Sequence, residues 1–370
     1  MPAEWEPQEG VLLCFPHSGR DWPGKWGAVV WAFVEFIRIA AQRQRVFLVV
    51  ADAAHRDRVS AMLERAHADL GQITFIEQRT NRSWMRDSGP IVVESAEGRE
   101  ALHFGFSGWA KYPNHRLDRL LPPVVAAALD LPVRPVVRGG RPVVLEGGSI
   151  DVNGRGTLLT TEECLLDPTI QIRNPGFTRA DYESVFAEEL GVTSTVWLGN
   201  GIAGDDTHGH IDDIARFVSP TAVLAAVEPD PRDVNHAPLA DNLRRLRAAR
   251  LADGRPLDII ELPMPHRIDF EGLRLPASYA NFLIINGAVL VPTFNDPRDR
   301  TALGILAECF PDREIIGIGA TDLIWGFGTL HCLSQQVPAA AQKPKNQVHM
   351  GNGNEILSPS NVKLTPARLN

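Results

Sequence analysis

Cysteine is scarce in this chain, and the few cysteines lie far apart. They are Cys14, Cys164, Cys309 and Cys332, with no CxxC pair among them. This spacing argues against a thiolate zinc site and against the paired cysteines of a small disulfide-stabilised domain. A reducing, cytoplasmic setting fits the pattern best.

Long apolar runs and an excess of basic charge are also missing. The most apolar long segment, residues 26–41, is interrupted by Glu35 and Arg38 and is too short to cross a bilayer. The first ten residues, MPAEWEPQEG, carry three glutamates and no basic start, so we expect no signal peptide. The net charge of −8 argues against nucleic acid or an anionic membrane as partner and mildly favours cationic small molecules.

The 370 residues, 44% of them apolar, suffice for one large domain or two ordinary ones. No linker or composition break divides residues 1–338, so we predict a single domain there. Residues 339–370 are rich in Lys, Asn, Gln, Ser, Pro and Gly, and we expect a mobile tail.

Helical and strand patterns alternate along the predicted domain. Two Asn-Gly pairs, at 153–154 and 286–287, predict hairpin turns. A strand–strand–helix–strand order recurs about five times, which favours a pseudo-symmetric α/β domain. The clearest predicted helices are 24–41, 52–68, 179–189 and 300–310, and the clearest predicted strands are 46–50, 73–77 and 222–227.

One stretch, GDDTHGHIDD at residues 204–213, places two histidines and four carboxylates within ten residues. If His210 and Asp212 lie on an extended lead-in to the strand at 214–218, their side chains share one face, and a base and a carboxylate face one cavity. A solvated acidic loop and a metal site are the alternatives. The candidate metal ligands are His208, His210, Asp205 and Asp212.

Three other segments, each at the border between a predicted loop or kink and a strand, carry side chains that could take part in catalysis. Asp87 lies in a polar loop before a predicted strand, Glu146 precedes a glycine kink, and Cys332 lies in a glycine-loosened strand ending at Pro338. A cysteine, a histidine and carboxylates that meet in space can maintain a reactive thiolate. Each also has a purely structural interpretation: a buried small side chain for Cys332, a salt bridge with Arg86 or a loop cap for Asp87, and hydrogen bonds from glycine amides for Glu146.

Several segments together resemble the agmatine deiminases, a branch of the guanidino-modifying superfamily that also includes bacterial peptidylarginine deiminases. The matching segments span residues 1–338 in order. They are MPAEWEPQE, WMRDSGP, GWAKYP, LEGGSIDVNGRGTLLTTEECLL, RNP, DDTHGHIDD, ASYANFLI and GTLHCLSQQ. The resemblance implies a fivefold pseudo-symmetric α/β propeller (the pentein fold) and hydrolysis of agmatine to N-carbamoylputrescine and ammonia.

The resemblance also implies a role for each matching residue. Cys332 becomes the nucleophile and His210 the general acid and base, while Asp87 and Asp212 grip the guanidinium of a small cationic substrate. Guanidinium is planar and cationic, so two carboxylates can orient it while sulfur attacks its carbon. A thiouronium forms and is then hydrolysed, with no metal and no organic cofactor.

The same resemblance makes Glu146 a support for the histidine and places Trp84 beside the stem of the substrate. Asp21, in the loop at residues 17–22, is a candidate partner for the far ammonium of agmatine, although Arg20 adjoins it. Arg86 is the one arginine inside the catalytic motifs, and we expect it to face away. No carboxylate receptor is then predicted, which favours agmatine over arginine.

Two positions depart from the family pattern. Phe327 stands between Gly326 and Gly328 where the family has a third glycine, and His208 replaces a smaller polar residue. Both bear on the shape of the pocket. The alternatives are a deiminase or amidinotransferase acting on arginine, peptidyl-arginine or a guanidino acid, and a metal-dependent hydrolase. The oligomeric state stays open, with a homo-oligomer as one alternative.

Overall fold

The computed structural model describes residues 1–340, which form one compact unit with a mixed α/β fold. The predicted mobile tail falls almost wholly on residues 341–370, outside the described residues. Among residues 1–340, no helix is both long and apolar enough to span a membrane. Helices and strands alternate throughout, as the sequence pattern predicts.

The first and last strands of the unit lie side by side. The sheet order is β20-β1-β2-β3, with β20 antiparallel to β1 and the other pairs parallel. Because β20 begins two residues after Cys332, this pairing brings the cysteine close to the start of the chain. The bounds are β1 Gln8–Cys14, α1 Trp26–Ala41, β2 Arg45–Val50, α2 Ala53–Arg65, β3 Ile73–Glu77 and β20 Ser334–Pro338.

Four further three-stranded sheets share one construction. In each, the first two strands pair antiparallel, and a helical connection leads to a third strand that pairs parallel with the second. The predicted recurrence of strand–strand–helix–strand is thus present. The strands are β4 Ile91–Ser95, β5 Gly98–His103 and β6 Val133–Pro135; β9 Asp151–Val152, β10 Thr157–Thr161 and β11 Ser194–Leu198; β12 Ala215–Phe217, β13 Ala222–Val227 and β14 Asp258–Pro263; β17 Leu283–Ile285, β18 Ala288–Thr293 and β19 Glu314–Gly319.

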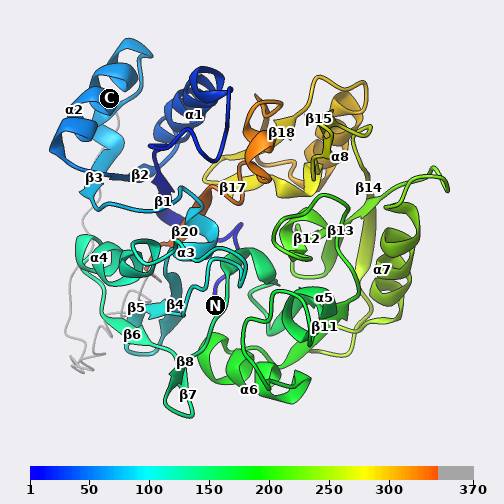
Figure 1. Cartoon of the computed structure of the whole chain (residues 1–370). Coiled ribbons are helices and arrows are strands. Elements are labelled where there is room, and N and C mark those ends of the chain that lie inside the picture. The colour runs from blue at the N-terminus through cyan, green and yellow to red at the C-terminus, as the bar shows by residue number, and fades with distance from the viewer. Residues whose placement is uncertain (341–370) are drawn as a thin grey trace, which may run out of the picture. The chain divides into compact units, whose positions relative to one another are not determined.

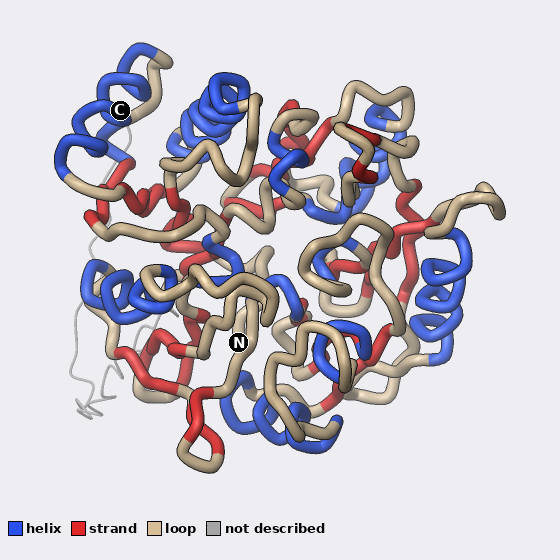
Figure 2. Tube along the Cα trace, viewed as in Figure 1, coloured by secondary structure: helices blue, strands red, loops and turns tan. Residues whose placement is uncertain are grey.

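The longer helices of these connections lie outside the strands, and loops lie nearer the middle of the view (Figures 1 and 2). The helices are α4 Leu121–Ala128, α6 Arg179–Leu190, α7 His236–Ala248 and α8 Asp299–Cys309, with the shorter α5 Glu162–Leu166. The two small hairpins are β7 Val137–Arg138 with β8 Arg141–Pro142, and β15 Asp269–Phe270 with β16 Leu273–Arg274.

Helix α1 packs against the sheet through an apolar face. Val29, Phe33, Phe36 and Ala40 recur at helical spacing and are fully buried against the sheet. The two charges that interrupt this apolar segment, Glu35 and Arg38, pair with each other on the other side at 2.7 Å. The predicted helix at residues 24–41 is therefore confirmed, and it is amphipathic.

A single turn precedes the first strand of each antiparallel pair. Four are helical turns, and neighbouring ones contact each other in chain order. The fifth, residues 330–333, carries Cys332 into β20. These turns bring distant segments together. The helical ones are α3 Met85–Ser88, η3 Gly147–Ser149, η4 Ile211–Asp213 and η5 Tyr279–Asn281; the remaining short helices are η1 Leu70–Gln72, η2 Asp118–Leu120 and η6 Leu323–Gly326.

Three local predictions are wrong at these turns. The segment around His210 and Asp212 is not extended, because η4 begins directly after His210. Gly147 begins a helical turn rather than kinking a continuous strand. Cys332 lies on the turn before β20, not within a strand. The hairpin at Asn286-Gly287 is confirmed by the pairing of Ile285 with Ala288.

Candidate active site

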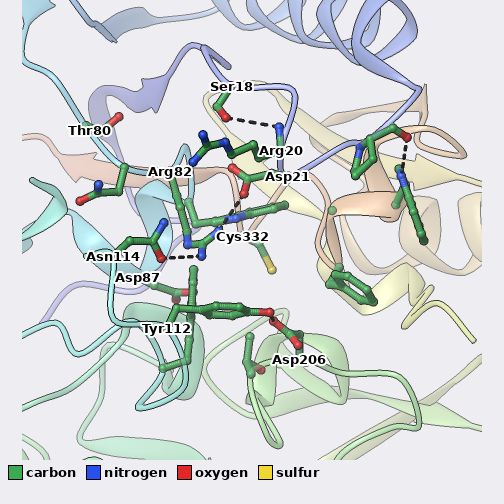
Figure 3. A pocket seen from close by; sticks show the side chains of 18 of the residues that line it. Ser18, Arg20, Asp21, Thr80, Arg82, Asp87, Tyr112, Asn114, Asp206 and Cys332 are labelled. Carbon is green, nitrogen blue, oxygen red and sulfur yellow. Dashed lines mark hydrogen bonds and ion pairs between the residues drawn. The ribbon is translucent and has the colours of Figure 1, made fainter. Parts of the chain in front are cut away.

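Two of the five turns, α3 and residues 330–333, contribute side chains to the lining of a pocket of about 540 Å³. Cys332 and Asp87 line it together with the aromatic side chains of Trp84, Trp109 and Phe327. Figure 3 shows the sulfur of Cys332 among the lining residues. The pocket is large enough for a small molecule and combines apolar walls with a few polar groups, which is typical of a ligand site.

Asp87, on turn α3, is held in place by two hydrogen bonds. The indole Nε1 of Trp109 donates to its Oδ2 at 2.8 Å, and the backbone N–H of Gly148 donates to its Oδ1 at 3.1 Å. Burial and the nearby carboxylates Asp212 and Glu146 raise the pKa of Asp87 to about 6, against the opposing effect of His210. The carboxylate is therefore ionised at neutral pH but close to its titration.

His210 is fully buried between two carboxylates. Its Nδ1 lies 3.8 Å from Oδ1 of Asp87 and 4.0 Å from Oδ1 of Asp212. Neither ring nitrogen has a hydrogen-bond partner within residues 1–340. Burial alone would lower the pKa of His210, but Asp87, the sulfur of Cys164 and Asp212 together raise it well above its usual value. The arrangement favours an imidazolium that can donate a proton.

Glu146 is buried near His210 and is paired with an arginine. Both carboxylate oxygens lie 3.3 Å from Nε of the buried Arg173. Ligand atoms of Glu146, Cys164 and His210 lie within 4.8 Å of one another. The guanidinium of Arg173 also donates to the backbone oxygen of Thr207, so it links Glu146 to the loop that carries His210.

Asp212, on turn η4, has two oxygens in different surroundings. Oδ2 lies 2.7 Å from Nδ1 of His331 and 3.5 Å from the sulfur of Cys332. Oδ1 is buried and lacks a hydrogen-bond partner among residues 1–340. Burial would raise the pKa of Asp212, but the contact with His331 and the charge of His210 lower it. An ionised oxygen is thus available to a cation.

Cys332 is the candidate nucleophile, and Asn281 of turn η5 holds it. The side-chain amide of Asn281 donates to the sulfur at 3.0 Å, and its Oδ1 accepts from the backbone N–H of Cys332 at 3.3 Å. Burial and the carboxylates Asp212, Asp213 and Asp87 raise the pKa of the thiol well above its usual value. The resting state is therefore a thiol, and a positive charge bound nearby would favour the thiolate.

The structure brings the seven sequence-predicted site residues into this one region. Trp84 and Asp21 line the pocket, while Glu146, His210 and Asp212 are buried beside Asp87 and Cys332. Asp21 is not free, because Nη1 of Arg82 lies 2.7 Å from its Oδ1.

Outside the catalytic cluster, the two departures from the family pattern differ in position. Phe327 lines the pocket with a left-handed backbone at φ 69°. His208 instead contacts Asp167 at 2.9 Å through Nε2, outside the pocket lining. Arg86 also faces away, as predicted, and its guanidinium bonds Gln335 and Gln336.

Several functional contacts were missed at the level of sequence. Arg20, which adjoins Asp21 in the sequence, and Arg82, which no motif marked, both line the pocket, so two arginines outside the catalytic motifs lie near the substrate site. Arg82 donates to Asp21 and to Asn114 (Figure 3). Trp109 and Asn281 stand in segments that match the family, but no local pattern marks which groups they contact.

The four residues proposed as metal ligands in the segment 204–213 do not form one cluster among residues 1–340. Asp205 accepts hydrogen bonds from the backbone of Thr207, Gly209 and His210 and so shapes the loop. Within residues 1–340, the groups with clustered ligand atoms are Glu146 with Cys164 and His210, and Asp212 with Asp213 and Cys332. Neither group contains His208 or Asp205.

Comparison with known proteins gives one consistent result. Residues 1–338 match the model of the Porphyromonas-type peptidyl-arginine deiminase family. An agmatine deiminase of Pseudomonas aeruginosa (strain LESB58) is 35% identical, with 92% of this chain and 95% of that protein covered. Solved structures of agmatine deiminases from C. jejuni with substrate bound and from Enterococcus faecalis are 29% and 31% identical, each with a TM-score of 0.82; 92% and 91% of this chain and 96% and 95% of those chains are covered.

Proposed function

Since the chain belongs to the Porphyromonas-type peptidyl-arginine deiminase family, we propose that it hydrolyses the guanidinium group of agmatine to N-carbamoylputrescine and ammonia. The observation that carries this proposal is that one thiol and one carboxylate line a pocket with one imidazole and a second carboxylate buried directly beside them. Relatives at 34–35% identity bear the name agmatine deiminase, which supports a hydrolase acting on a carbon–nitrogen bond.

Binding begins with charge pairing in this proposal. Asp87 and Oδ1 of Asp212 receive the N–H groups of the planar guanidinium, and the aromatic ring of Trp84 lies beside the substrate stem. The cation offsets the carboxylates that raise the pKa of Cys332. Substrate binding therefore promotes loss of the thiol proton, for which Oδ2 of Asp212 at 3.5 Å is a near acceptor.

Carbon–nitrogen cleavage follows from the same geometry. The thiolate of Cys332 attacks the guanidinium carbon and gives a tetrahedral adduct. Protonated His210 then donates its proton to one amino group, which leaves as ammonia while a thiouronium forms on sulfur. Glu146, held by Arg173, lies within 4.8 Å of a ring nitrogen of His210, and its negative charge favours the protonated imidazole.

Hydrolysis of the thiouronium returns the enzyme to its starting state. Neutral His210 takes a proton from a water molecule as the oxygen attacks the same carbon. The carbon–sulfur bond then breaks, the hydroxyl proton of the adduct passes to the departing sulfur as the ureido carbonyl forms, and Asp212 releases its proton to solvent with the product. The chain itself supplies every proton carrier and the nucleophile, so the steps require no metal or organic cofactor.

The far end of the pocket determines the substrate. Asp21 and Asp206 line it, but Asp21 pairs with Arg82, and Asp206 contacts Lys111 and Tyr112. The two carboxylates favour the ammonium of agmatine. Arginine or peptidyl-arginine is the second candidate, because Arg82, with Arg20 nearby, could bind a carboxylate or a peptide carbonyl if it left Asp21.

The recurring sheets also support a proposal for the architecture. We propose that residues 1–338 form a fivefold pseudo-symmetric α/β propeller, with one sheet in each unit. Five equivalent turns, one before each antiparallel pair, then supply Asp87, Asp212, Asn281 and Cys332, while Glu146 and His210 directly precede two of these turns. We also propose a cytoplasmic location, which the four unpaired cysteines support.

A panel of guanidino compounds tests the proposed function. Agmatine, arginine, a peptidyl-arginine and a guanidino acid are each incubated with the protein, and ammonia and the ureido product are measured together. Agmatine is expected to give both in equal amounts. Transfer of the amidino group to an added amine without ammonia would instead identify an amidinotransferase. No product from any compound would reject the function.

A further inference from the structure

His331, the neighbour of the nucleophile, is held between two buried carboxylates. Its Nδ1 lies 2.7 Å from Oδ2 of Asp212, and its Nε2 lies 2.8 Å from Oε2 of Glu4. A neutral imidazole donates from only one nitrogen, whereas ionised carboxylates only accept. The two contacts are satisfied together by a ring that carries hydrogen on both nitrogens and hence a positive charge.

Glu4 is fixed from other sides as well. Its Oε1 accepts the backbone N–H of Ile284 at 2.7 Å, and its Oε2 lies 2.7 Å from Nη2 of Arg216 and 3.7 Å from Nη2 of Arg86. Burial would raise the pKa of Glu4, but Arg216 and His331 hold it well below its usual range. Glu4 is thus an ionised, immobile partner for His331.

The contact with His331 determines which oxygen of Asp212 faces the substrate. Oδ2 faces His331 and the sulfur of Cys332, whereas Oδ1 lies 4.0 Å from Nδ1 of His210 and has no partner within residues 1–340. A carboxylate without this hold can rotate about its terminal bond. The orientation of the free oxygen therefore depends on a residue outside the pocket lining.

We propose that Glu4 and His331 are positioning residues, an inference that rests on the function proposed above. Glu4 holds His331, and His331 holds Asp212 with Oδ1 directed at the guanidinium. The imidazolium also places a positive charge beside the thiol of Cys332. Neither residue touches the reacting atoms, so both act through Asp212 and through the local field.

The charge of His331 acts among several other charges. Asp212, Asp213 and Asp87 face the sulfur of Cys332 and disfavour its thiolate. On the other side of the ring lie Glu4 and Asp151, which are offset by Arg216 and Arg86. Removing the imidazolium charge leaves more uncompensated carboxylate near the sulfur. Thiolate formation should then require a higher pH.

Two substitutions at one position separate orientation from charge. In His331→Asn the side-chain amide reaches the place of Nδ1 and still donates to Asp212. In His331→Gln it reaches the place of Nε2 and meets Glu4 instead. Both remove the charge. His266→Gln is the matched control, because His266 is an exposed histidine whose Nδ1 lies 2.9 Å from a carboxylate oxygen of Asp296.

The first readout is turnover of agmatine by variants whose melting temperatures show that they are folded. We expect kcat/KM to fall about 100-fold in His331→Gln and only about tenfold in His331→Asn. The larger loss should appear in both KM and kcat, because Asp212 binds the substrate and orients it for attack. His266→Gln should match the wild type.

The second readout needs no turnover. The rate of alkylation of Cys332 by iodoacetamide is measured against pH, with the modified peptide identified by mass spectrometry. Both variants of His331 should show the profile displaced to higher pH relative to the wild type and His266→Gln. A wild-type protein that turns over no guanidino compound would reject the proposed function, whereas this profile still tests the link between His331 and Cys332.

Equal kcat/KM values in folded His331→Asn and His331→Gln, together with an undisplaced alkylation profile, would overturn the inference and leave His331 a structural link. If neither variant of His331 folds, kcat/KM of the Glu4→Gln variant tests the inference instead. This variant keeps an acceptor for Nε2 of His331 but removes the charge that fixes the ring. A kcat/KM about tenfold below the wild type is expected, and a wild-type value overturns the inference.

Discussion

Gly148 and His210 are in direct contact. A Cβ added at Gly148 would lie 2.5 Å from Nδ1 of His210 and 2.9 Å from Oδ1 of Asp87. Both distances are shorter than a carbon atom tolerates, so the imidazole and the carboxylate pack against the backbone of the glycine itself. Glycine at this position is required by the two side chains that meet there.

We therefore expect Gly148→Ala to reduce kcat/KM for agmatine at least about 100-fold by displacing His210 and Asp87. Gly304→Ala is the control, because Gly304 lies within helix α8 and its added Cβ would meet no atom within 4 Å. That variant should keep its activity and melt at an equal or higher temperature. Wild-type kinetics in Gly148→Ala would contradict the packing described.

The ionisation of Asp87 should be visible in the pH profile. Its pKa of about 6 places the acidic limb of kcat/KM near that pH, because the protonated carboxyl cannot pair with the guanidinium. Trp109→Phe removes a hydrogen bond that favours the ionised form, so the limb should move to higher pH by roughly one unit. Trp31→Phe, at an exposed tryptophan, should leave it in place.

Removal of the nucleophile should separate binding from chemistry. Cys332→Ser is expected to lower kcat by several orders of magnitude, while agmatine still binds through Asp87 and Asp212. A further His210→Ala change should cost little more, since the two groups act as a unit. Mass spectrometry of the wild type, quenched in acid during turnover of agmatine, should find the thiouronium on Cys332. Modification at Cys14, Cys164 or Cys309 instead would show that the wrong sulfur was chosen.

Selectivity at the far end of the pocket should favour the decarboxylated substrate. Burial of an unmatched α-carboxylate is costly, so we expect agmatine to exceed arginine by about 100-fold in kcat/KM. Asp21→Asn should raise KM for agmatine if this carboxylate receives the ammonium, whereas Asp206→Asn tests the other acidic residue. Comparable turnover of agmatine and arginine would reject the preference and point to Arg82 as a carboxylate receptor.

Activity should survive exhaustive chelation. The proposed steps use a thiol, an imidazole and carboxylates, and none of them requires a metal ion. Treatment with EDTA followed by gel filtration should leave kcat and KM for agmatine unchanged. Loss of activity that a divalent ion restores would instead support the metal-dependent hydrolase.

Local patterns predicted the elements but not the turns that carry the site. The strand β2 and the Asn286-Gly287 hairpin follow from apolar runs and turn chemistry, which act over a few residues. The turn after His210 has no such signal, because contacts with other segments fix its backbone. An extended strand, in which alternate side chains share a face, was the predicted reason for His210 and Asp212 to lie together. They do lie together, but at a helical turn rather than on a strand.

Long-range pairing explains what the sequence could not reveal. Glu4 lies 327 positions from His331, and no periodicity connects them. On an extended chain His331 would point away from Cys332, yet the turn lets both contact Asp212. The resemblance to the family indicated which residues form the site. The residues that orient them, such as Glu4 and His331, could be found only from the three-dimensional structure.

The pairing of β1 with β20 has a consequence for how the protein becomes active during synthesis. Strand β1 is synthesised first, but its partner β20 is the last strand to be synthesised among the described residues. Cys332 reaches its place only when β20 pairs with β1. A nascent chain on the ribosome should therefore hold no working catalytic centre until residue 338 has left the exit tunnel. Circular permutation that joins these strands and opens the chain at the Asn286-Gly287 hairpin would make Cys332 and Glu4 neighbours early in translation.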